Sequence, residues 1–386
     1  MQKLTTTSSW LLISLVLLGG TVAIYALYSR SQQPVRLGFV AQLTGVQAEL
    51  GVQERNGVQL ALEEINARGG INGRRIDLVV QDDLGTPEGA QHAVRELLHA
   101  NVVAIIGHAT SGQTIAGLTV ATPARVVMLS PTATTPELSG KEDYFFRVCY
   151  SLVDRAHTLA RHIYLTRDIP RIAALHDTDN TAYSNAYLAA FVTEYQALGG
   201  SLTAQAAFSS RTQPDFAPLA AQLRASQPNA LLIIAADMET AMIAQRTRLM
   251  GWPVPLFTTA WAQTETLIHN GGQAVEGLEL ELAMPLDDLA PDYLRFTTRY
   301  QERFGQASSF GAAMGYEAAT VMAVALEKTR GQADGLALAL AGIKDVRGLT
   351  DTLSMNKYGD IIRPFHLGAI RDGKFVHINA LPSTNP

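Results

Sequence analysis

Small hydroxyl side chains gather directly after two strongly apolar segments of the chain. One segment is followed by Thr110 and Ser111, and the next by Thr132 and Thr134. Hydroxyl residues at the start of a helix leave backbone N–H groups pointing outward, and these groups together with the helix dipole favour a carboxylate. The pattern indicates an anion-binding site that needs neither a metal nor a lysine. The local sequence also allows Ser111 and Thr134 to be simple helix caps.

Aromatic and acidic side chains take the corresponding places in the second half of the chain. Tyr183 opens a predicted helix after one apolar segment, and Asp237 and Trp261 follow two others. A carboxylate such as Asp237 suits a ligand amine, and aromatic rings suit an apolar or cationic part. An anion cradle facing such a wall fits a zwitterion. Asp237 is equally well explained as an N-cap, and Tyr183 and Trp261 as packing residues.

The apolar segments that precede these side chains are continuous rather than alternating, which is typical of strands covered on both faces. Helical stretches lie between them, so the pattern predicts repeated βαβ units. The same alternation of strands and helices begins again after residue 150. We therefore predict an α/β fold with two doubly wound lobes. Ligands bind beyond the carboxyl ends of strands in such sheets, which would bring both sets of side chains to one crevice. The predicted strands are VRLGFV at 35–40, RIDLVVQ at 75–81, VVAIIG at 102–107, VVMLSP at 126–131, RIAALHD at 171–177, ALLIIAA at 230–236 and PLFTTA at 255–260.

The N-terminal segment points to a membrane. Residues 10–27 run for 18 positions without a charge, at the short end of what spans a bilayer, and Trp10 and Tyr28 stand at its edges. An uncleaved anchor is one interpretation. A cleaved secretory signal is the other, although the basic region is thin and no A-x-A site follows. Both place residues 35–386 outside the cytoplasm.

Composition and missing motifs exclude several function classes. The 30 basic and 35 acidic side chains give a net charge of −5, which makes nucleic acid an unexpected partner. The single cysteine, Cys149, allows no intrachain disulfide and no thiolate zinc site. The sequence contains no G-x-G-x-x-G, phosphate-binding loop, G-x-S-x-G or H-E-x-x-H. We expect no cofactor, no metal and no enzymatic activity, and we interpret His108 and His176 as structural.

Several longer stretches carry a family resemblance. They are AQLTGVQAELGVQERNGVQLALEEINARGGINGRRIDLVVQDD, VVAIIGHATSGQT, VVMLSPTATTPELS, RIAALHD with the following Tyr183, and GGQAVEGLEL at 271–280. In this order and spacing the chain resembles the type I periplasmic binding proteins, in particular the leucine/isoleucine/valine-binding branch that serves ABC importers. The similarity extends over residues 35–375.

The resemblance implies two Rossmann-like lobes joined by three hinge crossings, which close over a ligand without catalysis, preceded here by one N-terminal hydrophobic helix. It divides the chain into an anchor or signal with its linker at 1–34, a first lobe of 35–149 plus 285–350, and a second lobe of 150–284 plus 351–386. It also implies that Ser111 and Thr134 hold an amino-acid carboxylate.

The same resemblance assigns backbone contact with the amine to Thr132 and makes Tyr183 the aromatic residue that reaches in from the second lobe. The chain departs from the family at three positions. Trp261 stands where the leucine-binding proteins have an acidic partner for the ammonium, Leu50 where they have an aromatic residue, and Asp237 where they have a tyrosine. The family's small disulfide is also missing.

We therefore expect an extracytoplasmic solute-binding protein that captures an amino acid or a similar small carboxylate for an ABC permease. An amide, urea or an aromatic acid is the alternative ligand. A membrane-tethered receptor subunit that signals through a partner protein is the alternative function. Replacing Ser111 or Asp237 with alanine should each weaken binding by more than about 1 kcal/mol, the scale of a lost hydrogen bond to a charged group.

Overall fold

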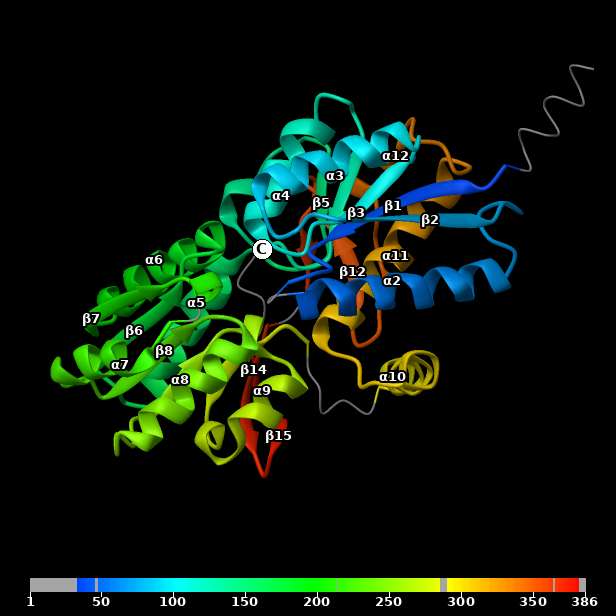
Figure 1. Ribbon diagram of the computed structural model, residues 1–386. Helices are drawn as coiled ribbons and strands as arrows, with labels where there is room; N and C mark the ends of the chain where they lie inside the picture. Colours follow the sequence, from blue (N-terminus) through cyan, green and yellow to red (C-terminus); the bar gives the residue numbers. More distant parts are fainter. Residues whose placement is uncertain (1–32, 46–47, 213, 285–289, 364, 382–386) are drawn as a thin grey trace, which may run out of the picture.

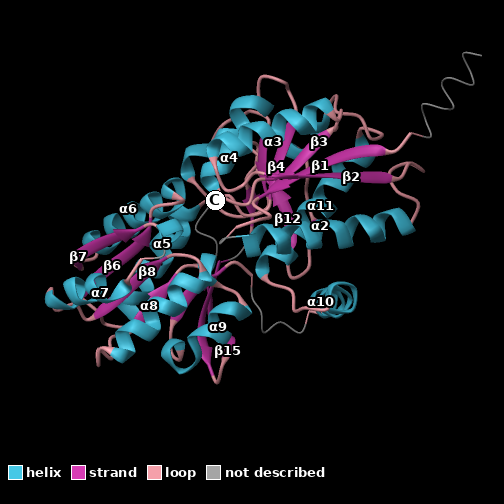
Figure 2. Cartoon of the chain, viewed as in Figure 1, coloured by secondary structure: helices cyan, strands magenta, loops and turns pink. Residues whose placement is uncertain are grey.

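The chain forms two lobes that lie side by side, each with a sheet between helices (Figures 1 and 2). The structure, a computed structural model, describes residues 33–45, 48–212, 214–284, 290–363 and 365–381. The predicted membrane segment lies outside these ranges. Among the helices that the structure describes, none is long and apolar enough to cross a bilayer.

The first lobe is built on a parallel sheet with the strand order β2-β1-β3-β4-β5. Its strands are β1 (Val35–Ala41), β2 (Ile76–Asp82), β3 (Ala104–Gly107), β4 (Val127–Ser130) and β5 (Phe145–Arg147). Its helices are α2 (Ala48–Ala67), α3 (Pro87–His99), α4 (Ser111–Ala121), α10 (Pro291–Phe304), α11 (Phe310–Lys328) and α12 (Leu336–Ala341). The strand order reverses between β1 and β3, the type of point at which open α/β sheets bind ligands.

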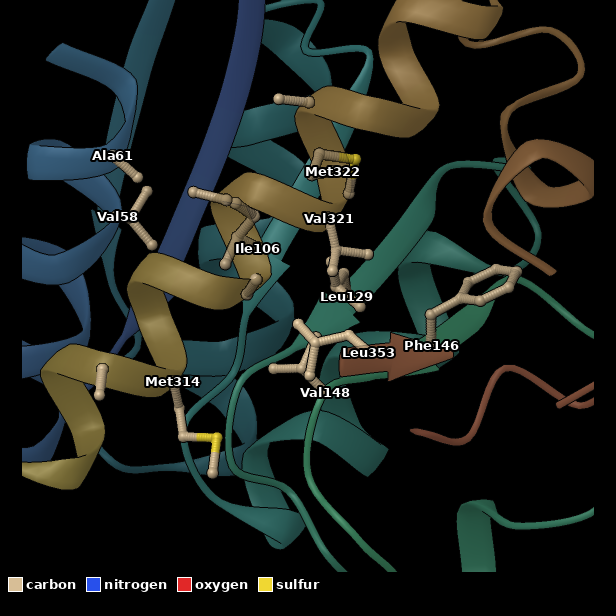
Figure 3. Packing of buried hydrophobic residues seen from close by; sticks show 14 of the residues in the cluster. Val58, Ala61, Ile106, Leu129, Phe146, Val148, Met314, Val321, Met322 and Leu353 are labelled. Atoms are coloured by element: carbon tan, nitrogen blue, oxygen red, sulfur yellow. The ribbon is translucent and has the colours of Figure 1, made fainter. Parts of the chain in front are cut away.

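Both faces of this sheet are covered, which explains why its strands are continuously apolar. Leu37 and Phe39 of β1 belong to the hydrophobic cluster that contains α2 and α11, whereas Val40 belongs to the cluster that contains α3 and α4. Figure 3 shows the first cluster, with Ile106 of β3 close to Met322 and Val321 of α11. Alternation of side chains along each strand therefore serves two cores.

Two glycines allow helices α2 and α11 to lie in backbone contact. A Cβ atom at Gly57 would come within 1.9 Å of the Ala312 carbonyl oxygen, and one at Gly315 within 2.3 Å of the Glu54 carbonyl oxygen. Any larger side chain at either position would force the helices apart. This close approach buries Glu54 completely at the cleft side of the lobe.

The second lobe contains a sheet with the order β15-β14-β10-β9-β8-β6-β7, parallel from β10 to β7 and antiparallel at β14 and β15. Its strands are β6 (Arg171–Asp177), β7 (Ser201–Phe208), β8 (Ala230–Ile234), β9 (Leu256–Thr258), β10 (Glu279–Leu282), β14 (Phe365–Arg371) and β15 (Lys374–Leu381). Helices α5 (Leu152–Arg161) and α6 (Thr181–Ala197) cover one face, and α7 (Phe216–Ala225), α8 (Asp237–Leu249) and α9 (Glu265–Gly271) cover the other. The predicted α/β architecture is confirmed.

The chain passes between the lobes after β5, after β10 and after a small antiparallel sheet of β11 (Val346–Arg347), β12 (Thr352–Met355) and β13 (Ile361–Ile362). The exact lobe boundaries stay a prediction, but the segment after residue 351 packs against a different lobe than we predict. We expected residues from 351 onward in the second lobe, yet Leu353 and Ile361 belong to the first hydrophobic cluster. A bridge between Arg147 and Asp360 ties this segment to β5.

Candidate ligand-binding site

A cavity of about 380 Å³, partly open to solvent, lies between the two lobes at the carboxyl ends of their strands. It contains six of the seven residues that the sequence singled out, and Asp237 is the exception. The lining comprises Leu50, Ala109, Thr110, Ser111, Thr132, Thr134 and Phe310 from the first lobe and Arg155, Asn180, Tyr183, Ala260 and Trp261 from the second.

The hydroxyl residues reach the cavity because each follows a central strand. Thr110 precedes α4 and Ser111 is the first residue of that helix, directly after β3. Thr132 and Thr134 follow β4, the neighbouring strand. Adjacent parallel strands end at the same edge, so the two loops meet as expected.

Simple helix capping does not describe these hydroxyls. Thr110 occupies the N-cap position of α4 without a capping bond, and its hydroxyl instead contacts the Gln113 side chain. The Ser111 hydroxyl accepts a 3.3 Å hydrogen bond from the Thr135 backbone N–H, which joins the two loops. The Thr134 hydroxyl is buried and has no hydrogen-bond partner among the described residues. Buried hydroxyls are normally bonded, so Thr134 retains capacity for a ligand.

Thr132 is held from behind by the buried Glu54 of α2. Its hydroxyl lies 2.5 Å from Glu54 Oε1 and 2.5 Å from the Ala109 carbonyl oxygen. Burial raises the pKa of Glu54 to about 8, against the lowering effect of the Thr132 bond. Glu54 is therefore mainly a neutral acid at neutral pH, and it contributes little negative charge to the cavity.

The aromatic residues form a wall on the second lobe. Tyr183, in the first turn of α6, and Trp261, after β9, meet edge to face with ring centroids 5.4 Å apart. Tyr187, one turn later in α6, lies against Tyr183 with the ring centroids 5.8 Å apart. Burial raises the pKa of the Tyr183 hydroxyl well above its usual range, so this group stays a neutral donor. The wall offers flat apolar surface with one polar tip.

Arg155 of α5 also lines the cavity, and the sequence analysis missed it. Its side chain is buried, with 5% exposure, and its Nη2 atom donates a 2.8 Å hydrogen bond to the Leu282 carbonyl oxygen. Its Nε atom is buried and has no hydrogen-bond partner within the part of the chain that the structure describes. An arginine within an amphipathic helix is ordinarily solvent-facing, so no local pattern marks Arg155 as a site residue. Asn180 and Phe310 were missed too, because neither carries a distinctive spacing.

Asp237 lies in an adjoining cavity with Glu49, Met238, Glu239 and Thr264. Its carboxylate accepts hydrogen bonds from the Met238 backbone N–H and the Thr264 hydroxyl. Leu50, Trp261 and Phe310 line both cavities. Asp237 therefore binds its own helix start and Thr264 rather than facing Ser111. Within the described ranges, no cluster of histidine, cysteine, aspartate or glutamate side chains could hold a metal ion.

Hydrogen bonds between described residues also connect the two lobes. The Gly112 N–H donates to the Asn180 side-chain oxygen over 3.4 Å, which joins the start of α4 to the start of α6. The Arg211 guanidinium donates to the Gly85 carbonyl oxygen. Each of these contacts joins a residue of the first lobe to a residue of the second.

Comparison with known proteins agrees with this architecture. Residues 34–380 match the family described as periplasmic binding protein. The Leu/Ile/Val-binding protein BraC3 of Rhizobium johnstonii is 31% identical over 157 residues, which cover 40% of this chain and 43% of that protein. The chain thus aligns with less than half of this relative's length.

Solved structures share the fold over nearly the whole chain. The leucine-binding protein LivK of Thermotoga maritima has a TM-score of 0.83 at 24% identity and covers 90% of this chain and 99% of its own. An ABC transporter solute-binding protein of Rhodopseudomonas palustris, solved with 3,4-dihydroxy benzoic acid, has a TM-score of 0.81 at 22% identity, with 91% and 97% covered.

The family resemblance that the sequence indicated is confirmed. The matched family consists of binding proteins rather than enzymes, which agrees with the expected lack of catalysis. Proteins of this family act outside the cytoplasm. On the match over residues 34–380, the chain belongs to the periplasmic binding protein family.

Proposed function

We propose that this protein captures an amino acid or a similar small carboxylate outside the cytoplasm and delivers it to an ABC permease. The observation that carries the proposal is the shared cavity, which joins Ser111 and Thr134 of one lobe to Tyr183 and Trp261 of the other. A ligand held by residues of both lobes stabilises their approach, because its contacts are complete only when the lobes are together.

The hydroxyl loops receive the carboxylate. Thr134 offers a hydroxyl without a hydrogen-bond partner among the described residues, and Ser111 lies at the start of α4. The helix dipole adds a favourable field for a negative charge. Tyr183 and Trp261 cover the remainder of the ligand from the opposite side. This division of contacts supports lobe closure as the binding mechanism.

Two kinds of small carboxylate are candidate ligands, one supported by named relatives and the other by a structural neighbour. The relatives include proteins named for leucine, isoleucine and valine, and a structural neighbour was solved with an aromatic acid. An aromatic acid therefore stands beside an amino acid as a candidate. We propose further that residues 10–27 tether the protein to the membrane, with a cleaved signal as the alternative.

A thermal-shift screen tests the proposal, because a ligand that binds only the folded protein raises its melting temperature. The panel contains amino acids, amides, urea and aromatic acids. We expect a carboxylate to raise the melting temperature of the wild type and to raise that of Thr134→Val less. A panel in which every compound leaves the wild type unchanged contradicts the proposed function.

A further inference from the structure

We infer that the cavity selects a monocarboxylic acid with an apolar or aromatic body and no ammonium group, and that Arg155 imposes this selection. The inference rests on the proposed function, because it names the ligand class of the same site. It differs from the zwitterion that the sequence pattern favours.

The charge of the cavity lining favours a ligand that carries a negative charge and no positive charge. Among the described residues that line it, Arg155 is the only one with a charge. The other polar side chains are neutral hydroxyls, the Asn180 amide and the Trp261 indole N–H. An α-ammonium group placed here would have no carboxylate to pair with, and an unpaired buried ammonium is costly.

Arg155 is a buried cation with unused hydrogen-bonding capacity. Its Nε atom has no partner, while Nη2 is bonded to the Leu282 carbonyl oxygen. Glu281 interacts with Arg155 electrostatically but accepts no hydrogen bond from its Nε atom. Glu281 Oε2 accepts a hydrogen bond from the Tyr187 hydroxyl, and Glu281 Oε1 has no hydrogen-bond partner among the described residues. A ligand carboxylate supplies the charge-assisted bond that the guanidinium lacks.

Two acidic residues near the cavity are buried and have raised pKa values, and three others line the adjoining cavity. Burial raises the pKa of Glu54 to about 8 and also raises the pKa of Glu281. Asp237, Glu49 and Glu239 lie in the adjoining cavity.

The remaining surface suits an apolar body. Leu50 and Phe310 of the first lobe line the same cavity as Trp261 and Tyr183 of the second. An alkyl or phenyl group fits such a lining because it leaves no polar atom without a partner. Arg155 then fixes the acid end, together with the free Thr134 hydroxyl.

Calorimetry with two matched pairs of acids tests the selection directly on the full-length protein. Isocaproate is leucine without its ammonium group, and hydrocinnamate is phenylalanine without its ammonium group. We expect at least one of the two deaminated acids to bind about tenfold or more tightly than its amino acid, since only the amino acid must bury an unpaired cation.

The variant Arg155→Gln tests the residue. It should lose at least about tenfold in affinity for the preferred acid, whereas Arg161→Gln, on the exposed side of the same helix, should keep wild-type affinity. Circular dichroism and the melting temperature establish that each variant is folded. If Arg155→Gln does not fold, the two acid pairs on the wild type still decide the ligand class.

The outcomes separate this inference from the proposed function. Equal or tighter binding of leucine and phenylalanine overturns the inference and leaves capture of a small carboxylate standing. Preferred binding of the deaminated acids with unchanged affinity in folded Arg155→Gln overturns the role of Arg155. Binding of an amide or urea alone overturns the inference, and binding of no compound overturns the proposed function with it.

Discussion

The Thr132 hydroxyl lies 2.5 Å from the Oε1 atom of the buried Glu54, in the wall of the cavity. The same hydroxyl also lies 2.5 Å from the Ala109 carbonyl oxygen, which can only accept. One hydroxyl has a single proton, so it cannot donate both bonds. The arrangement is satisfied when Thr132 donates to Ala109 and a protonated Glu54 donates to Thr132. Geometry and the raised pKa of Glu54 thus agree.

Glu54 should make the protein less stable as pH rises. Its pKa is raised from 4.5 to about 8 in the folded protein, so its stabilising contribution is complete below about 4.5 and is lost as pH rises toward 8. The variant Glu54→Gln stays neutral and should show a shallower fall in unfolding free energy over this window, by up to about 1.4 kcal/mol per pH unit. Urea unfolding at several pH values measures this slope.

The exposed Glu302 of α10 supplies the matched control. Glu302→Gln should keep the wild-type slope, because this side chain is exposed to solvent on the surface of α10. Identical slopes for wild type and Glu54→Gln would mean that Glu54 is charged in the folded protein.

The free hydroxyl of Thr134 should matter for binding and not for folding. We expect Thr134→Val to weaken carboxylate binding by about 1 kcal/mol or more, measured by calorimetry, without lowering the unfolding free energy. The hydroxyl has no partner in the free protein, so its removal breaks no existing bond. Ser111→Ala should weaken binding as well, but it also removes the bond to the Thr135 N–H and should lower stability.

Thr119→Val serves as the control for these hydroxyl variants, because Thr119 is exposed on α4 and its hydroxyl bonds the Ala116 carbonyl oxygen. Its affinity should equal that of the wild type. Unchanged affinity in Thr134→Val and Ser111→Ala alike would remove the hydroxyl loops from the site.

Asp237→Ala should affect binding less than Ser111→Ala does. The sequence alone led us to expect a loss of more than about 1 kcal/mol, but the Asp237 carboxylate bonds Thr264 and the Met238 N–H in the adjoining cavity. We now expect a change in binding free energy below about 0.5 kcal/mol, typical of a residue outside the site. A larger loss than in Ser111→Ala would restore Asp237 as a ligand partner.

The bond from Arg211 to the Gly85 carbonyl oxygen should favour the closed arrangement of the lobes. We expect Arg211→Gln to weaken binding by about 1 kcal/mol and to give a larger radius of gyration with ligand, measured by small-angle X-ray scattering. Arg224→Gln, on the outer side of the second lobe, should match the wild type. Equal affinity and equal compaction in Arg211→Gln would show that this contact does not contribute to closure.

Much of the site could be predicted from the sequence because strand ends in a parallel sheet converge. Continuous apolar runs identified the strands, and the residues after them include Ser111, Thr134, Tyr183 and Trp261, all in one cavity. The predicted helix at about 183–198 corresponds to α6, Thr181–Ala197. This prediction depends only on the topology of the sheet. Burial of both sheet faces makes the strands continuously apolar, so they can be recognised in the sequence.

Other features depend on packing that no local pattern encodes. Arg155 reaches the cavity from the first turn of α5, and Phe310 lies about two hundred residues after Ser111 in the sequence. Asp237 follows a strand as the rule requires, but its own hydrogen bonds turn it to Thr264. The position of Leu353 in the first lobe likewise depends on long-range contacts.

Tryptophan fluorescence tests the central claim most directly, because Trp261 lines the cavity while Trp252 is buried in the core of the second lobe. The titrant is the carboxylate that raises the melting temperature most in the thermal-shift screen. We predict that it changes the emission of the wild type and of Trp252→Phe with the same Kd, and that Trp261→Phe loses most of this change. An undiminished signal in Trp261→Phe, with none in Trp252→Phe, would contradict binding between the lobes.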